Sequence, residues 1–421
     1  MSIGYLVTGK KDECYGCEAC VQVCAHSALH LVEDEEGFRY PLVNKDKCVN
    51  CGLCNKVCPV EHPLEKETDE QIAFGGYAKD SQIRENSTSG GAFSAIVDRW
   101  CSGGGENYAV FGALADGLEV RHSYVVDKSL ISPFRKSKYS QSEIGDAFKK
   151  VRCFLKEEYS VLFSGTPCQI GALLNYLRLY RTSTEKLLTV EVVCEGVPSP
   201  LYVRKLNEFF LRKYKTPIST IDYRNKDNMR WDFEVMEVGF KRVKTGFFNS
   251  FGLSGCKVSN KTDRWFNPFW SIWLQHLMSR PSCYKCAYAT KSRVADITLG
   301  DLWGVHIYCP ELYGNNGGSS VVVANTVKGR EVVAGIQQSM VGHELDMDDV
   351  VRFQGPMRRP VSENPRREEC MADLQNPLKK YEEINCRWAK SPSLKLLFNK
   401  YIWGNRQKVA LWNIKQSFGR K

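Results

Sequence analysis

Eight cysteines within the first 58 residues constrain this chain more than any other feature. They form two runs that share the spacing C-x2-C-x2-C-x3-C, which is typical of bacterial proteins that bind cubane iron–sulfur clusters. Two complete runs in tandem are a specific signal, and they predict two 4Fe-4S clusters. The runs are Cys14, Cys17, Cys20 and Cys24, then Cys48, Cys51, Cys54 and Cys58, followed by Pro59.

The spacing also predicts which cysteines share a cluster. Three closely spaced thiolates can wrap one face of a cluster, while the fourth cysteine is carried away at a helix start and ligates the other cluster. In the first run Ala25 stands where a proline is usual, but this change removes no ligand. The expected ligand sets are Cys14, Cys17, Cys20 and Cys58 for one cluster, and Cys48, Cys51, Cys54 and Cys24 for the other.

Zinc and disulfides are the alternatives for these cysteines. Zinc sites rarely use two interleaved runs of four cysteines. Disulfides are disfavoured, because the N-terminal MSIGYLVTGKKDEC has no apolar signal core and a reducing, cytoplasmic compartment is expected.

Composition is that of an ordinary globular protein with an uneven charge. The chain has 421 residues, enough for two or three domains, and no run of 18 apolar residues that would predict a transmembrane helix. Residues 1–66 hold seven Lys/Arg and ten Asp/Glu, a net charge of −3, which leaves +13 for the remainder. A basic body of this kind could attract nucleic acid, anionic lipid or an acidic redox partner, and charge alone does not choose among them.

The texture of the sequence divides the chain into four parts. Residues 1–66 form the cluster module and end in the polar linker Glu61 to Gln71. Residues 67–150 and 151–350 form the two parts of a larger body, and residues 351–421 form a basic aromatic tail. The predicted fold class is α+β / α/β: a small bacterial-ferredoxin-like module followed by a mixed α/β body.

Alternating strands and helices characterise the body. Residues 107–115 read as a strand, and residues 160–180 read as a buried strand, a turn at Gly165-Thr166-Pro167 and a helix. Residues 186–200 read as the next buried strand, so the three elements predict a right-handed parallel unit. Residues 215–250 alternate like antiparallel strands, and SSVVVANT is a late strand followed by a helix.

Four cysteines of the body stand out from the other ten. Cys168 and Cys194 follow consecutive parallel strands, so their thiols can meet at one edge of the sheet. Cys283 and Cys286 form a C-x2-C pair, and together the four thiolates could hold a third cluster. Zinc is a second possibility, and a buried small hydrophobe is the alternative for Cys168 and Cys194 individually. The remaining six are expected to be packing or surface residues: Cys101, Cys153, Cys256, Cys309, Cys370 and Cys386.

A short loop of small residues precedes a helical pattern at residue 92. Its backbone N–H groups and the helix dipole suit a phosphate, although hydroxyl residues before a helix usually serve only as an N-cap. A second loop at residues 314–320 could approach a ligand or form a plain surface turn. The first loop consists of Ser87, Thr88, Ser89, Gly90 and Gly91.

In combination, these motifs resemble the beta subunit of coenzyme F420-reducing hydrogenase and its formate-dehydrogenase relatives, from about residue 72 to residue 350. The resemblance rests on the segments STSGG, Lys138-Tyr139 to Ser142, FSGTPCQIGAL, CEGVPSP, Cys283-x2-Cys286 and ADITLGDLWG. It implies a flavin, normally FAD, beside an iron–sulfur cluster, and two-electron exchange with a deazaflavin or related substrate.

The resemblance also implies roles for individual residues. Cys168, Cys194, Cys283 and Cys286 would hold the third cluster, whereas Ser87 to Gly91, Lys138 and the segment from Asp296 to Asp301 would line the flavin pocket. Read alone, Lys138 is a solvated lysine, and Asp296 and Asp301 are helix-capping or turn residues. A flavin joins one-electron and two-electron carriers, which agrees with this reading.

The carboxyl tail is basic and aromatic. Residues 386–421 contain nine Lys/Arg and no Asp or Glu, with six aromatic residues interleaved. Such a segment can lie on an anionic membrane surface or dock to a partner, or it can be a terminal helix packed on the body. The aromatic residues are Trp388, Phe398, Tyr401, Trp403, Trp412 and Phe418.

The sequence therefore predicts an iron–sulfur flavoprotein oxidoreductase that moves electrons between its clusters and a two-electron substrate. A non-catalytic electron-transfer subunit, or a cluster-bearing scaffold for a partner enzyme, is the alternative. The expected partners are a redox protein or a small two-electron carrier, and no nucleic acid. No catalytic residue is assigned.

Overall fold

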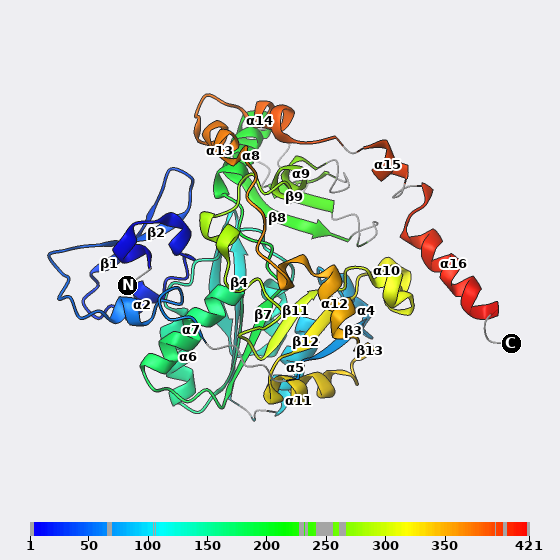
Figure 1. The fold of residues 1–421 in the computed structure, drawn as a ribbon, viewed down its shortest axis with the longest axis horizontal. Helices are drawn as coiled ribbons and strands as arrows, with labels where there is room; N and C mark the ends of the chain where they lie inside the picture. Colours follow the sequence, from blue (N-terminus) through cyan, green and yellow to red (C-terminus); the bar gives the residue numbers. More distant parts are fainter. Residues whose placement is uncertain are drawn as a thin grey trace, which may run out of the picture.

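The computed structural model describes residues 4–64, 70–103, 105, 107–226, 231, 235–240, 256–260, 267–391, 393–398 and 402–418. A small N-terminal module lies against a large central sheet, and a second, mainly helical layer with a smaller sheet lies beside it (Figure 1). The predicted mixed α/β fold class is confirmed. The middle of the predicted linker, parts of the predicted strands at 215–250, and Tyr401 lie outside the described residues.

The N-terminal module is built from short elements around the cysteine runs. Its hairpin pairs Leu29 with Val43 at one end and Glu33 with Arg39 at the other. The fourth cysteine of each run was expected at a helix start, and this was wrong: Cys24 caps the end of α2, and Cys58 follows α3. The elements are α1 (Tyr5–Thr8), η1 (Lys11–Glu13), α2 (Ala19–Val23), β1 (Leu29–Glu33), β2 (Arg39–Val43) and α3 (Leu53–Lys56).

The central sheet has the strand order β13-β3-β12-β11-β7-β6-β4-β5. Its four middle strands, β11, β7, β6 and β4, are parallel, and the flanking pairs are antiparallel. The strands are β3 (Ile72–Ala78), β4 (Tyr108–Asp116), β5 (Glu119–Val125), β6 (Ser160–Gly165), β7 (Leu187–Val192), β11 (Ile297–Asp301), β12 (Ser320–Ala324) and β13 (Met340–Leu345). The predicted parallel unit is confirmed.

Helices cover both faces of this sheet because its strands are apolar on both sides. On β6, Val161 and Phe163 face α6 (Ala147–Lys156) and α7 (Pro167–Leu179), whereas Leu162 faces α5 (Ala92–Gly103) and α11 (Val327–Ile336). The first of these cores also includes Val23 and Val57, so the N-terminal module shares a core with the body.

The junction between β6 and α7 places Cys168 at the carboxyl edge of the sheet. Thr166 and Gln169 form a capping box, with Gln169 Oε1 accepting from the Thr166 amide at 3.0 Å, and Pro167 occupies the first helical position. This arrangement stops the strand and begins the helix within two residues, as the sequence predicted.

A second layer packs around aromatic side chains. Trp270, Trp273 and Tyr202 lie in one core with residues from α13 and α14. The elements of this layer are α8 (Pro200–Tyr214), β8 (Ile218–Asn225), β9 (Val235–Phe240), β10 (Cys256–Asn260), α9 (Pro268–Trp273), α13 (Arg367–Gln375) and α14 (Tyr381–Trp388), and its three strands are antiparallel in the order β10-β9-β8.

Short helices connect these layers and form the carboxyl tail. They are α4 (Ser81–Glu85), η2 (Lys128–Leu130), η3 (Ser132–Phe134), η5 (Pro281–Lys285), α10 (Val305–Tyr308), η6 (Pro310–Asn316), α12 (Met347–Phe353), η7 (Gly355–Met357), α15 (Leu394–Leu397) and α16 (Asn405–Phe418). Helix α16 contacts α10 and η6, but Leu411, Ile414 and Phe418 are exposed. Among the described residues, no helix is long and apolar enough to cross a bilayer.

A buried histidine makes the stability of this fold depend on pH. His122 lies between the Ser164 carbonyl oxygen and the Ser142 hydroxyl, each 3.0 Å away, and burial lowers its pKa from 6.5 to about 4. Below pH 6.5 the unfolded chain therefore binds a proton that the folded chain refuses, so stability falls as the pH falls towards 4. Wild type should lose about 2 kcal/mol more than His122→Gln between pH 7 and pH 5.

Urea denaturation at the two pH values measures this difference, with His30→Gln as the control because His30 is exposed. Equal pH dependence in wild type and His122→Gln would contradict the prediction.

Candidate functional site

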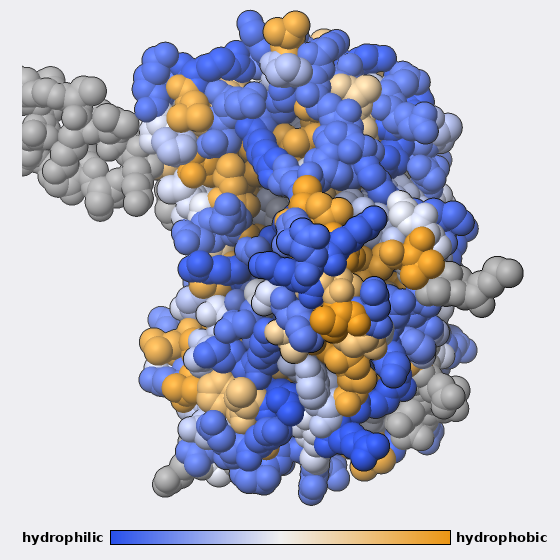
Figure 2. All heavy atoms as spheres, turned by 90° about the vertical axis from the view of Figure 1, so that its left-hand side faces the viewer, coloured by the Kyte–Doolittle hydropathy of each residue, from blue (hydrophilic) through white to orange (hydrophobic). Residues whose placement is uncertain are grey.

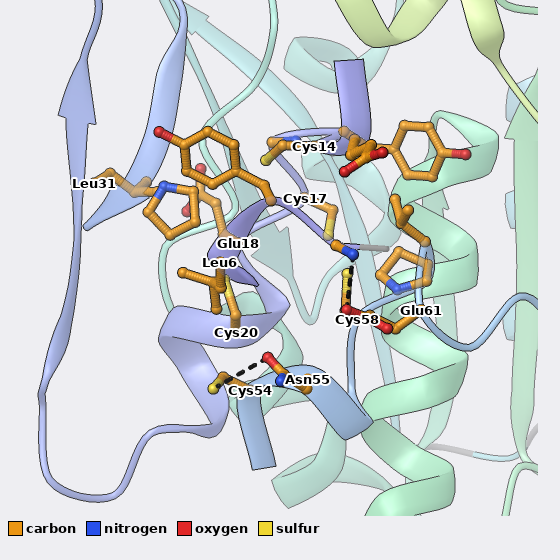
Figure 3. A pocket seen from close by; sticks show the side chains of 18 residues that line it. Leu6, Cys14, Cys17, Glu18, Cys20, Leu31, Cys54, Asn55, Cys58 and Glu61 are labelled. Atoms are coloured by element: carbon orange, nitrogen blue, oxygen red, sulfur yellow. Dashed lines mark hydrogen bonds between the residues drawn. The ribbon is translucent and has the colours of Figure 1, made fainter. Parts of the chain in front are cut away.

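Four thiols of the N-terminal module surround one hollow. Cys14, Cys17, Cys20 and Cys58 line a space of about 520 Å³ between α2 and the segment that follows α3. Figure 3 shows these side chains around the hollow, with Cys54 below Cys20. Burial and the neighbouring Cys58, Cys20 and Cys14 thiols raise the pKa of Cys17. The structure thus brings together the first predicted ligand set, which we call the inner set.

The second predicted set lies further out. Burial raises the pKa of Cys54, and the neighbouring Cys51 and Cys48 thiols raise it further. Cys24 Sγ accepts a hydrogen bond from the Ala28 amide at 3.3 Å, and the Ala28 carbonyl pairs with Asn44, which precedes this segment. We call Cys24, Cys48, Cys51 and Cys54 the outer set.

The four distinctive cysteines of the body also line one hollow, of about 600 Å³. Cys168 comes from the start of α7, Cys194 from the loop after β7, and Cys283 and Cys286 from η5 and its end. Parallel β6 and β7 end at the same edge of the sheet, so the loops that follow them converge as predicted. These four cysteines are the body set.

Burial dominates the electrostatics of the body set. It raises the pKa of Cys168 to about 12 and that of Cys283 to about 11, and it also raises the pKa of Cys194. The thiols of the set raise one another's pKa values further. Such thiols hold their protons at neutral pH, so binding a metal group there must release protons.

A zinc site needs its ligands about 2.3 Å from a single ion. In the part of the chain that the structure describes, no group of three or more His, Cys, Asp or Glu side chains is arranged for one metal ion. Of the six other cysteines, Cys101, Cys309 and Cys370 are buried, and Cys153 and Cys386 are exposed. The side chain of Cys256 lies outside the described residues.

Tyr15 connects the inner hollow to the body hollow. It lines both, and its ring meets that of Tyr288 edge to face, with centroids 5.6 Å apart. Burial raises the pKa of both tyrosines, and thiols from both sets raise it further. The inner set and the body set are therefore separated by one pair of aromatic rings.

Arg280 fixes this junction. The side chain is 1% exposed, and it donates to the carbonyl oxygens of Cys14 at 2.9 Å and Arg39 at 3.0 Å and to Gln141 Oε1 at 3.1 Å. Its guanidinium also lies 4.3 Å from the centre of the Tyr40 ring. Arg280 stands three residues before Cys283, so one side chain ties the loop of the body set to the inner set.

The small-residue loop at 87–91 is packed tightly by its neighbours. Ser89 Oγ donates to the Ser319 carbonyl oxygen at 2.6 Å, the Gly90 amide donates to Ser320 Oγ at 2.9 Å, and Thr88 Oγ1 accepts from the Ser137 amide at 2.8 Å. Ser87 Oγ donates to the Ile83 carbonyl oxygen, and a Cβ on Gly90 would lie 2.5 Å from the Gly76 carbonyl oxygen. The loop therefore lies at the carboxyl end of β3, against the 317–320 segment.

Lys138 lies near this loop, but its ammonium group turns to its own segment. It donates to the carbonyl oxygens of Pro133 at 2.9 Å and Arg135 at 2.7 Å, and burial lowers its pKa to about 7. The structure thus brings Lys138 to the edge of the group of loops without aiming it into the group.

Asp301 and Asp296 lie at opposite ends of β11. Asp301 forms a buried ion pair with Arg224, at the same sheet edge as the 87–91 loop. Asp296 precedes the strand, where its carboxylate accepts from Thr189 and Thr326, each at 2.8 Å. The structure brings Asp301 to the group of loops and leaves Asp296 at the far edge.

Basic and aromatic residues from β8 and its neighbours complete this group. Lys226 donates to the carbonyl oxygens of Ser89 at 2.8 Å and Gly317 at 3.0 Å, and burial lowers its pKa to about 7. The Trp231 and Trp303 rings stack 5.0 Å apart. Among the described residues, the buried Oδ1 of Asp301 and Nε1 of Trp231 have no hydrogen-bond partner.

Comparisons with known proteins agree with this arrangement. Residues 13–62 match the family model of the 4Fe-4S dicluster domain, and residues 159–349 match that of the C terminus of the coenzyme F420 hydrogenase/dehydrogenase beta subunit. The chain is a 4Fe-4S dicluster domain joined to an F420 hydrogenase/dehydrogenase beta-subunit domain. The resemblance predicted from the motifs is confirmed, and the chain belongs with redox electron-transfer proteins.

Among solved structures, a chain of the F420-reducing [NiFe] hydrogenase complex from Methanosarcina barkeri is similar, at 15% identity and a TM-score of 0.39. The alignment covers 66% of this chain and 83% of that chain. No curated protein matches this sequence.

Sequence reasoning missed the residues that join the dicluster domain to the beta-subunit domain. Arg280, Tyr15 and Tyr288 lie within five residues of predicted ligands, and that proximity was the only available signal. Arg224, Lys226 and Trp231 carry no motif or periodicity, and their positions beside Asp301 follow from the packing of β8 against distant loops.

Proposed function

We propose that this protein is an iron–sulfur flavoprotein oxidoreductase that carries electrons between three 4Fe-4S clusters and a two-electron substrate by way of FAD. The observation that carries the proposal is the position of the body set. Its hollow shares Tyr15 with the inner set, and β7, which precedes Cys194, lies next to β11, which ends at Asp301. One-electron and two-electron components would therefore meet at one edge of the sheet.

The cysteine sets fit clusters by their donor chemistry. Each set supplies four thiols, the requirement for one 4Fe-4S cluster, and the inner and body sets line hollows that contain almost no other donor type. The ligands in this proposal are Cys14, Cys17, Cys20 and Cys58; Cys24, Cys48, Cys51 and Cys54; and Cys168, Cys194, Cys283 and Cys286.

The loops beside Asp301 fit a flavin. The buried Asp301 Oδ1 can accept, and the buried Trp231 Nε1 can donate, while Trp303 offers an aromatic wall. We assign the Ser87–Gly91 loop, Lys138, Lys226 and Asp301 to this pocket. Asp296 is left out because Thr189 and Thr326 occupy its carboxylate.

A bound flavin would supply the exchange between one-electron and two-electron transfer. The chain's own residues would hold and shield the path: Tyr15 and Tyr288 fill the space between the inner and body sets, and Arg280 fixes their separation. Lys226, with its pKa lowered to about 7 by burial, can carry a positive charge beside an anionic group or release the proton near neutral pH.

Anaerobic purification followed by assays of iron, acid-labile sulfide and released flavin tests the proposal. The expected values are about twelve irons, about twelve sulfides and one FAD per chain. Zinc in place of iron, or about eight irons, would remove the body cluster from the proposal, and full iron without flavin would remove the two-electron mechanism.

A non-catalytic electron-transfer subunit is the second candidate, and the tail favours it. Leu411, Ile414 and Phe418 lie on one side of α16 and are exposed, as a helix that docks to a partner would be. Turnover of the isolated chain with a viologen donor and a deazaflavin acceptor would count against this candidate.

A further inference from the structure

The two cysteine sets of the dicluster domain differ in their access to solvent. In the inner set, Cys17 is buried and Cys20 packs against the core shared by the dicluster and beta-subunit domains. In the outer set, Cys51 is exposed and Cys48 and Cys24 are half-buried. An electron carrier that approaches from solvent therefore meets the outer set first.

The structure also orders the three sets along one line. Cys54 of the outer set lines the same hollow as the inner set, next to Cys20 (Figure 3). On its other side the inner set is followed by Tyr15, Tyr288 and the body set. The order is outer set, inner set, body set, so the surface over the outer set is the entrance to or exit from the protein for single electrons.

That surface is basic, although the domain around it is acidic. The exposed residues beside Cys51 include three lysines and one aspartate, a local charge of +2 within a segment whose net charge is −3. Val49, 57% exposed, adds an apolar contact. Figure 2 looks onto the side of the molecule that carries this domain. We define the outer patch as Lys45, Asp46, Lys47, Val49, Asn50, Cys51 and Lys56.

We propose that the outer patch is the docking surface for a small acidic protein that carries single electrons. The proposal rests on the proposed function, because it takes the outer set as a cluster. Positive groups around an exposed redox centre attract and orient a negatively charged partner, which raises the association rate. In each encounter the reduced carrier loses one electron and this chain gains one, or the reverse, and no bond is formed or broken.

The test uses the full chain and a reduced acidic two-cluster ferredoxin as the probe. Association rate and Kd are measured by surface plasmon resonance, and electron transfer by stopped-flow spectroscopy. Lys45→Glu/Lys47→Glu/Lys56→Glu should lower the association rate about tenfold at low salt, and the neutral glutamine triple variant should lie between it and wild type. Raising the salt to about 0.3 M should remove most of the difference between them.

The matched control is Lys149→Glu/Lys150→Glu/Lys156→Glu, which changes the same charge on exposed positions of α6. It should alter the association rate less than about twofold. Reduction by dithionite, which needs no docking, should proceed at wild-type rates in all variants.

Equal effects of the two triple variants, or salt-independent binding, would overturn the proposal. Wild type that binds the ferredoxin at the patch but contains no iron would instead sink the proposed function, so the two failures are distinguishable. Binding by a basic carrier, such as a cytochrome c, with higher affinity than the acidic ferredoxin would also overturn the assignment.

Discussion

Cys194→Ser is expected to lower the iron content from about twelve to about eight per chain, with a matching loss of sulfide. Cys194 lies in the body hollow, where burial raises its pKa and the other three thiols of the set surround the same space. A serine hydroxyl is a poor substitute for a thiolate in a site of this type. The dicluster domain supplies its own eight cysteines, so its two clusters should remain.

The same substitution should interrupt electron flow between the dicluster domain and the two-electron acceptor. Loss of a group that only supports a metal ligand costs about 10–100-fold, so loss of the ligand itself should cost at least about a hundredfold in turnover. Reduction of the remaining clusters by dithionite should be unchanged, which stopped-flow spectra can follow separately.

Cys101→Ser is the matched control, because Cys101 is also a buried cysteine but lies in α5 on the other face of the sheet. It should keep about twelve irons and near-wild-type turnover. Full iron content in Cys194→Ser, with an unaltered spectrum, would contradict the role of the body set.

The features that the sequence predicted correctly depend on local patterns. The cysteine runs declare their chemistry by spacing, and the β6–α7–β7 unit follows from two apolar runs separated by a Thr-Pro helix start. Cys168 and Cys194 could be placed together because consecutive parallel strands end at the same edge of a sheet. Short-range sequence information was sufficient in each case.

The separation of Asp296 from Asp301 has a geometric cause. The two residues belong to one motif, but β11 runs between them and carries them about 15 Å apart. Proximity in a motif therefore did not mean proximity in space. The fourth cysteines were misplaced for a similar reason: α2 and α3 are so short that each helix ends before Cys24 or Cys58 is reached.

The contacts that join the two domains were beyond sequence reasoning. Arg280 contacts Cys14 and Arg39, which are more than 240 residues away in the chain. Arg367 pairs with Glu36 across an even longer separation. No periodicity or spacing encodes which backbone carbonyl a distant arginine will meet, so these residues could be identified only from the packed structure.

Arg280→Ala is expected to loosen the junction between the dicluster domain and the beta-subunit domain. Three hydrogen bonds from a buried guanidinium would be lost, and two carbonyl oxygens and the Gln141 side chain would lose a donor. The free energy of unfolding should fall by about 4 kcal/mol, since each hydrogen bond to a charged group contributes about 1.5–3 kcal/mol and water replaces part of the loss. Urea denaturation under anaerobic conditions measures this change.

Arg204→Ala is the matched control for stability. Arg204 also joins the body to the N-terminal domain, through Glu33, but the two side chains are 46% and 40% exposed. An exposed ion pair contributes at most about 1 kcal/mol, so this variant should be nearly as stable as wild type. Similar losses in both variants would show that burial of Arg280 is not what matters.

The junction has a second readout that a merely structural role would not move. Arg280 connects the loop of Cys283 to the backbone of Cys14, so its loss should change the separation between the inner and body sets. In the fully reduced protein, the magnetic interaction between these two clusters should weaken in the electron paramagnetic resonance spectrum while iron stays near twelve.

Arg280→Lys should restore the interaction only in part, because lysine keeps the charge but cannot reach three acceptors with a planar fork. An unchanged magnetic interaction in Arg280→Ala, at full iron content, would show that the two sets are held in place by the surrounding core and that Arg280 does not position them.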